Sequence, residues 1–445
     1  MLIVDTPQDL VTYHNNTKSK LIQVVPLLKN SKHHYINNSV IACYVVCDGE
    51  SYLFPWKHPE SVFSEYSIED IISHTKCYFY EKGVLMYDNV LVNNVFDLEL
   101  VHYINTTEPL SVEPIDTEQF YQRHYQKYSS VGNLISLATF VKYAKSVIQQ
   151  ANTTTESGLA YYNNMQNVLH MVERNGLCVN LSYFTPIYGQ PINLFNKTVY
   201  TKYNLFTSTG RPSNRFGGIN FAALPKQDDT RKSFVSRYEN GCLVEMDFKA
   251  YHPHIIAYLC DYDFGDENVY EHLAKHYFDT QKPTKEHTEK AKEYTFNQIY
   301  GGINKKYLHI DFFAKTKAYT ELLWEQFKEK GCIISGISGR TLHSDYETST
   351  DTQLFNYFIQ MTETELNMAY LNRLLQHIDG NNALPVLYTY DAVVFDCKKE
   401  YVDDLVSKIM YNTSAKFPIS VKVGDNYKEM NPYMYEATTS VYVYN

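Results

Sequence analysis

Residues 384–396 read LPVLYTYDAVVFD, two apolar runs that meet at Asp391 and Ala392. Short apolar runs bounded by turn residues are typical of buried strands, and two runs joined this closely predict a β-hairpin. A second apolar run, CLVEM at 242–246, ends on Asp247, which we therefore place at the end of another strand. Pro253 falls in the first turn of the helix expected next. The sequence thus predicts strands that end on two aspartates.

These two aspartates are candidate metal ligands. Phosphoryl transfer needs little covalent help and much charge neutralisation, which carboxylate oxygens provide by holding Mg²⁺. An aspartate at a strand end is more often an ordinary turn residue. The interpretation of both aspartates as metal ligands therefore depends on the segments that lie between them in the chain.

The segment HTEKAKEYTFNQIYGG at 287–302 is predicted to be a helix in which Lys292, Phe296 and Tyr300 recur every fourth residue. Residues at that spacing share one helix face. A cation, an aromatic ring and a phenol in line can hold a triphosphate at one end and stack on a base at the other. The alternative is an amphipathic helix with both rings in the core and the lysine in solvent.

Other polar segments allow two interpretations each. TSTGRPSN at 207–214 is a glycine-turned loop whose Arg211 could reach a nucleic-acid backbone or minor groove, although Thr-Gly-Arg alone is common. Lysine-rich segments at 304–306 and 315–317 fit either a DNA channel or a solvated face. The 41 tyrosines fit either stacking on bases or a coding bias.

Six segments occur in an order that resembles the family A DNA polymerases. They are TSTGRPSN (the TGR loop), VEMDFKAYHPHIIAYL at 244–259 (motif A), KAKEYTFNQIYGG at 290–302 (motif B), GCIISGISGRTL at 331–342 (the segment returning to the palm), NYFIQMTETEL at 356–366 (the Asn-x-x-x-Gln helix) and TYDAVVFD at 389–396 (motif C). The stretch NVLHMVERNGLCVN at 167–180 also resembles the thumb region that precedes the palm.

The resemblance implies an α+β multidomain fold: a right-hand polymerase with palm, fingers and thumb, preceded by an RNase H-like α/β domain of the 3′-5′ exonuclease type. The expected domains are 1–115 (exonuclease-like), 116–200 (helical thumb and palm entry), 201–262 (palm with motif A), 263–345 (fingers with motif B) and 346–445 (palm with motif C). A proline-bearing linker is expected at 106–116, and a separate helical segment from 131 to about 175.

The resemblance also implies roles for individual residues. Asp247 and Asp391 would hold two Mg²⁺ ions, for which Mn²⁺ can substitute, with the Phe248 carbonyl as a further ligand. Lys292 would contact the phosphates and protonate the pyrophosphate. Phe296 would pack against the incoming nucleotide, and Tyr300 would close the pocket beside the templating base. The residues implied to touch the primer-template minor groove are Arg211, Asn356 and Gln360.

Motif A departs from the family pattern at one position. The family carries a glutamate five residues after the aspartate, as a gate against the ribose 2′-hydroxyl, and this chain has His252. The imidazole is similar in bulk, and Tyr251 beside it is a candidate to share the role. DFKAYHPHII also faintly resembles motif A of family B, but the later motifs favour family A.

Three further departures concern charge. Ala392 replaces the auxiliary carboxylate of motif C, so only two metal-binding carboxylates remain. Thr288 replaces an arginine on the fingers helix, whose charge Lys285 or Lys290 would have to supply, and Tyr270 replaces a phosphate-binding histidine. Because both aspartates and Lys292 are present, these changes indicate a divergent member, of viral or phage type.

The N-terminal region is expected to be a remnant exonuclease domain without proofreading. IQVVPLLKN at 22–30 falls where the first metal-binding strand would read Asp-x-Glu, but Val25 and Leu27 stand at those places. Asp97 in VFDLEL is the one carboxylate retained, and one carboxylate cannot form a two-metal hydrolytic site.

Length, net charge, cysteine usage and apolar runs limit the class of protein to which the chain can belong. The chain has 445 residues and a net charge of −10, which a polymerase with a basic cleft tolerates. Its eight scattered cysteines suggest neither disulfides nor zinc. Without a signal peptide or an apolar run of about 18 residues, we expect a soluble intracellular protein with no membrane partner, in the host cytoplasm if viral.

The expected partners are primer-template DNA, dNTPs and other replication proteins. Two alternatives stay open. His252 at the gate position motivates an RNA polymerase or reverse transcriptase of the same fold. A catalytically silent primer-template binding protein is the other, although loss of Asp247, Asp391 or Lys292 would be its signature and all three are present.

Overall fold

The computed structural model describes residues 1–29, 34–55, 57–58, 60–61, 67–73, 75–87, 90, 94–113, 115, 135–154, 158–191, 193–343, 348–412 and 417–434. The chain divides into two compact units, each with its own sheet. The first comprises Met1–Gly176, Thr185–Phe206 and Asn214–Phe221, and the second comprises Leu177–Phe184, Thr207–Ser213 and Ala222–Asn445. Within the described ranges, no helix is both long and apolar enough to cross a membrane.

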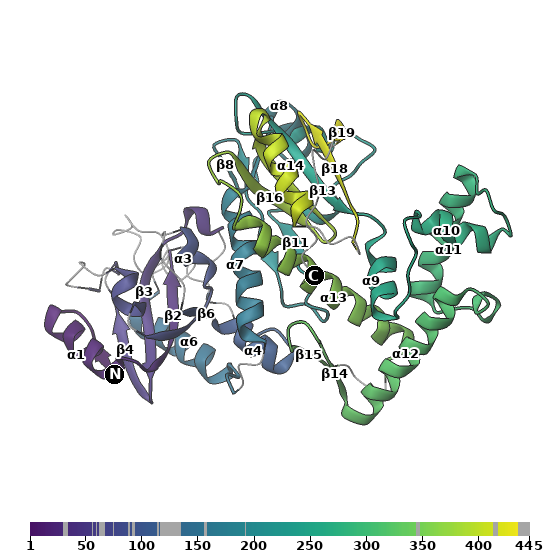
Figure 1. Cartoon of the computed structure of the whole chain (residues 1–445). Coiled ribbons are helices and arrows are strands. Elements are labelled where there is room, and N and C mark those ends of the chain that lie inside the picture. The colour runs from purple at the N-terminus through teal and green to yellow at the C-terminus, as the bar shows by residue number, and fades with distance from the viewer. Residues whose placement is uncertain are drawn as a thin grey trace. The chain divides into compact units, whose positions relative to one another are not determined.

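The first unit is built on a six-stranded mixed sheet of order β1-β4-β3-β2-β5-β6 (Figure 1). Its strands are β1 (Leu2–Ile3), β2 (Leu21–Leu28), β3 (Val40–Cys47), β4 (Glu50–Phe54), β5 (Lys76–Phe79) and β6 (Val95–Asp97). The apolar, β-branched runs of β2 and β3 are almost wholly buried, as a strand covered on both faces requires. Strands β2, β3 and β4 pair antiparallel, whereas β5 runs parallel to both β2 and β6.

Helices complete this unit: α1 (Pro7–Thr17), α2 (Ile68–Ile72), α3 (Gly83–Tyr87), α4 (Leu98–Thr106), α6 (Leu137–Gln150) and α7 (Leu159–Asn175). The helical segment expected from 131 to 175 therefore forms two helices, and it ends before Gly176, whose φ of 58° suits a glycine. Residues 131–134 lie outside the described ranges. The linker expected at 106–116 begins where α4 ends, and its positions 114 and 116 also lie outside them.

The second unit contains a five-stranded antiparallel sheet of order β16-β17-β13-β18-β19. Its strands are β13 (Gly241–Phe248), β16 (Ala383–Thr389), β17 (Ala392–Lys398), β18 (Ile419–Gly424) and β19 (Met430–Pro432). The predicted hairpin forms from β16 and β17, with its turn at Tyr390 and Asp391. The pairing of β13 with β17 sets Asp247 opposite Ala392, so both predicted aspartates lie at the same end of the sheet.

The main helices of this unit are α9 (Tyr251–Leu259), α10 (Val269–Tyr277), α11 (Lys285–Gly301), α12 (Asp311–Lys330), α13 (Asp351–Leu375) and α14 (Val402–Tyr411). Helices α10, α11 and α12 meet around the ring of Tyr277, which contacts Tyr294 at 5.6 Å and Phe313 at 5.9 Å between centroids. Figure 1 shows these three helices together, and the helix predicted at 287–302 corresponds to α11.

Several short strands and one further α-helix lie between the larger elements already described. They are β7 (Leu177–Cys178), α8 (Leu181–Tyr188), β8 (Leu194–Phe195), β9 (Thr198–Val199), β10 (Tyr203–Asn204), β11 (Ser213–Phe216), β12 (Ile219–Asn220), β14 (Cys332–Ile334) and β15 (Thr341–His343).

Candidate active site

The two predicted aspartates border one cavity of about 460 Å³ in the second unit. Asp247 lies near the end of β13, and Asp391 lies in the turn between β16 and β17. The backbone N–H of Phe248 donates to the Asp391 carbonyl at 3.0 Å, which ties the strand end to the turn. The other predicted site residues on this cavity are Arg211, Phe248, His252, Lys292, Phe296 and Tyr300.

The environment of the two carboxyl groups disfavours two negative charges. Burial, the neighbouring Asp391 and then Glu245 raise the pKa of Asp247 to about 6. Burial and then Glu363 raise the pKa of Asp391. A divalent cation would relieve this repulsion, and the two carboxylates are the oxygen donors that Mg²⁺ prefers. The described residues contain no group of three or more histidine, cysteine or acidic side chains that could hold a metal ion.

One face of α11 supplies the aromatic and cationic wall. The rings of Phe296 and Tyr300 stack with centroids 5.7 Å apart and planes 7° from parallel. The Lys292 amine lies 5.8 Å from the centroid of the Tyr270 ring, which also borders the cavity. The buried residues of the helix are Ala291, Thr295 and Ile299. The rings of Phe296 and Tyr300 therefore do not fill the core, whereas Lys292 is exposed, as the alternative had it.

The lysines proposed to replace the missing arginine of α11 lie elsewhere. The Lys290 amine pairs with Glu286 at 2.6 Å, and that of Lys285 lies 4.0 Å from Glu289. Neither lysine lines the cavity. Tyr251, the residue beside the gate position, does line it, and its ring stacks on Phe248 with centroids 4.2 Å apart.

Asn356 and Gln360 lie on α13 but do not line the cavity. The Asn356 amide donates to the Tyr300 carbonyl at 3.1 Å, so it contacts the end of α11. The backbone carbonyl of Gln360 accepts a hydrogen bond from the Thr364 hydroxyl within the helix. The structure thus brings together all the predicted site residues except these two.

Glu363 is a cavity residue that sequence reasoning missed. Its side chain is 2% exposed, and one oxygen lies 3.1 Å from His252 Nε2 while the other lies 3.0 Å from Arg211 Nε. His252 Nδ1 is in turn 2.5 Å from the Tyr300 hydroxyl. The sequence spacing could have pointed to Glu363, because it follows Gln360 by three residues and so shares its helix face.

Arg211 connects this carboxylate to the aspartate turn. Its guanidinium lies over the Tyr390 ring, 3.8 Å from the centroid. Tyr390, which precedes Asp391, has a φ of 66°, and its carbonyl accepts a hydrogen bond from the Asn367 amide. Arg211 and Asn367 therefore both hold the turn that carries Asp391.

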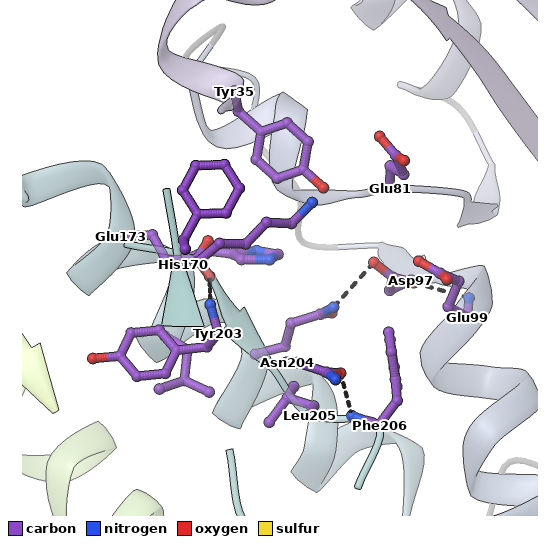
Figure 2. Close-up of a pocket in the computed structure, with 14 residues that line it drawn as sticks. Tyr35, Glu81, Asp97, Glu99, His170, Glu173, Tyr203, Asn204, Leu205 and Phe206 are labelled. Carbon is purple, nitrogen blue, oxygen red and sulfur yellow. Dashed lines mark hydrogen bonds between the residues drawn. The ribbon is translucent and has the colours of Figure 1, made fainter. Parts of the chain in front are cut away.

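The first unit has a separate cavity of about 310 Å³ (Figure 2). Its acidic lining residues are Glu81, Asp97, Glu99 and Glu173, of which the sequence reasoning had identified Asp97 alone. Asp97 caps α4 by accepting from the backbone N–H groups of Glu99 and Leu100, and it also accepts from the Gln166 amide. Val25 and Leu27, which stand where the resemblance predicts exonuclease carboxylates, are buried on β2.

No protein-family model matches the sequence. No curated protein is significantly similar to it in sequence. The structure is similar to that of the POL domain of Pol1 from M. smegmatis in complex with DNA primer-template and dNTP. The TM-score is 0.75, the match covers 96% of this chain and 99% of that chain, and the sequence identity is 14%. The likeness shows the fold, so the expected α+β polymerase-domain fold is confirmed.

Proposed function

We propose that the chain is a DNA-directed DNA polymerase of the family A type, which extends a primer with dNTPs on a DNA template. The observation that carries this proposal is the single cavity that joins Asp247 and Asp391 to Lys292, Phe296 and Tyr300. The polymerase-domain fold supports it, as does the primer-template and dNTP named for the similar M. smegmatis domain.

The donor set suits two Mg²⁺ ions, held by Asp247, Asp391 and the Phe248 carbonyl, with Mn²⁺ able to substitute. When bound, such ions neutralise the triphosphate and lower the pKa of the primer 3′-hydroxyl. Lys292, at the cavity wall, binds the phosphates and protonates the departing pyrophosphate.

The remaining residues position the substrates. Phe296 packs on the incoming nucleotide, and Tyr300 closes the pocket beside the templating base. Arg211, Asn356 and Gln360 contact the minor groove of the primer-template near the growing end, where they test pair shape. By this assignment 201–262 and 346–445 form the palm, 263–345 the fingers, and 116–200 the thumb and palm entry.

We propose that the exonuclease-like domain over 1–115, which is part of the first unit, does not proofread. The support is that Val25 and Leu27 are apolar and that Asp97 already serves as a helix cap. Incubating the protein with a 3′-labelled mismatched primer and Mg²⁺ tests this directly. Release of the terminal nucleotide that persists in Asp391→Ala protein would overturn it.

The departures at positions 252, 288 and 392 support a divergent member of viral or phage type, acting inside the host cell with other replication proteins. The polymerase itself is tested by extension of a labelled DNA primer on a DNA template, with dNTPs or with rNTPs, beside an Asp391→Ala control. Extension with dNTPs that vanishes in the variant is the expected result. Extension with rNTPs alone would favour the RNA polymerase, and extension by neither would favour a silent DNA-binding protein.

A further inference from the structure

A buried carboxylate on α13 touches two residues of the candidate active site at once. Glu363 lies 3.1 Å from His252 Nε2 and 3.0 Å from Arg211 Nε. The family resemblance places a glutamate at position 252, and this chain has an imidazole there. We propose that Glu363 is a positioning residue for sugar discrimination, supplying from α13 the carboxylate that motif A lacks. This inference rests on the proposed polymerase function.

The imidazole of His252 is held from both sides. Its side chain is 8% exposed, with Glu363 facing Nε2 and the Tyr300 hydroxyl 2.5 Å from Nδ1. The Tyr300 hydroxyl is within hydrogen-bond distance of Nδ1, whereas the Glu363 carboxylate contacts Nε2 without completing a hydrogen bond to it. The hydrogen bond at Nδ1 and the carboxylate packed against Nε2 together restrict the rotation of the ring, so its edge keeps one position at the cavity wall.

The same carboxylate also holds Arg211. The Arg211 Nη2 group donates to Glu363 Oε1 at 3.4 Å, and the guanidinium lies over the Tyr390 ring beside Asp391. Burying a carboxylate costs free energy that a single polar neighbour offsets poorly. The Glu363 carboxylate faces both a guanidinium and an imidazole. Glu363 thus links the gate position, the 207–213 loop and the metal-site turn.

Sugar selection follows from this fixed ring. A gate excludes a 2′-hydroxyl only if its side chain cannot move aside, because a mobile ring yields to one added oxygen. Without Glu363, the carboxylate no longer fills the space beside Nε2, and the His252 ring can rotate about its Tyr300 contact. The added hydroxyl then fits, and selection for deoxyribose falls.

The test compares kcat/KM for dCTP and CTP opposite the same template guanine in intact protein, Glu363→Gln and Glu363→Ala. We expect the dCTP-over-CTP ratio to fall about tenfold to a hundredfold in Glu363→Ala, and less in Glu363→Gln, which keeps an acceptor. The double variant His252→Glu/Glu363→Ala returns a carboxylate to motif A and is expected to restore the ratio.

Glu365→Gln is the matched control, because it removes a buried carboxylate from the same helix. Glu365 accepts from Ser338 at 2.6 Å and from Ser335. An unchanged ratio in Glu363→Ala, an equal fall in Glu365→Gln, or no recovery in the double variant would overturn the inference. Thermal melting identifies variants that fail to fold, in which case Glu363→Gln decides.

A second measurement separates this inference from the proposed function. Dissociation constants for dCTP and CTP are measured on a primer that ends in a dideoxynucleotide and cannot be extended. If the intact chain extends no primer but prefers dCTP through Glu363, only the polymerase proposal fails. If it extends primers with a ratio that ignores Glu363, only the inference fails. If it binds neither nucleotide, both fail.

Discussion

The backbone N–H of Phe248 donates a hydrogen bond to the carbonyl oxygen of Asp391 at 3.0 Å. This bond continues the ladder in which Asp247 faces Ala392, so the end of β13 and the hairpin turn are fixed by backbone pairing. The carboxyl groups of both aspartates can then be changed without removing the bonds that place them. Loss of activity in such variants can therefore be assigned to the carboxylates.

Asp391→Asn is expected to reduce primer extension by about a hundredfold to a thousandfold, because a neutral amide cannot supply the charge that binds and orients a divalent ion. Initial rates at saturating Mg²⁺ and dNTP measure the effect. Asp425→Asn is the control, since Asp425 is exposed and pairs with Lys399. Equal rates for Asp391→Asn and intact protein would remove Asp391 from the metal site.

Lys292→Met is expected to lower kcat/KM for dNTPs about tenfold to a hundredfold, through loss of a charge-assisted contact with the triphosphate. Steady-state kinetics on a fixed primer-template provide the measurement. Lys290→Met tests the neighbouring lysine, whose amine is engaged with Glu286, and should stay close to the intact protein. A larger loss in Lys290→Met would assign the phosphate contact to Lys290.

Tyr300→Phe removes the hydroxyl that contacts His252 and keeps the ring that stacks on Phe296. A neutral hydrogen bond contributes about 0.5–1.5 kcal/mol, so selection against CTP should fall about twofold to tenfold while dCTP incorporation is nearly unchanged. Tyr294→Phe on the same helix is the control, because its ring packs on Tyr277. A change in dCTP incorporation alone would contradict a role in sugar selection.

Local patterns were sufficient for the elements that carry the site. The hairpin around Asp391 and the shared face of Lys292, Phe296 and Tyr300 follow from short-range alternation and from helical periodicity. Glu363 could not be assigned a role in this way, because its contact with Arg211 spans 152 positions of the chain. Such contacts depend on how the helices and loops pack, which no local pattern records.

Local patterns were equally insufficient for the acidic residues of the first unit. Asp97 was singled out through the resemblance to exonuclease domains, but its use as a cap for α4 depends on the exact end of β6. Its bond to Gln166 joins positions 69 apart. Glu81, Glu99 and Glu173 were not singled out, because a lone glutamate carries no local sign that it will border a cavity.

Asp97→Ala should therefore destabilise the first unit and leave primer extension unchanged. Loss of a helix cap and of a buried acceptor lowers the free energy of unfolding by about 1–3 kcal/mol. Urea unfolding followed by hydrogen exchange in residues 98–106 measures this loss, with exposed Glu50→Ala as the control. Undiminished protection of α4 would show that the cap contributes little.

Glu173 is expected to make the stability of the first unit depend on pH. Burial raises the pKa of Glu173 from 4.5 to about 8, and its Oε1 accepts from the Tyr203 N–H. Between these pH values the folded chain holds a proton that the unfolded chain has lost. The stabilisation is therefore complete below about pH 4.5 and is lost as the pH rises through about 8, with a slope of up to about 1.4 kcal/mol per pH unit.

Glu173→Gln isolates this contribution, because the amide keeps an acceptor for Tyr203 and carries no charge at any pH. The variant should lose most of the slope of unfolding free energy between pH 5 and pH 8, and it should be more stable than the intact protein at the upper end. Glu69→Gln, at an exposed glutamate of the same unit, should retain the full slope. If Glu173→Gln also retains the slope, the pH dependence arises from other buried groups. Glu99 is one such group, because burial raises its pKa well above the usual range.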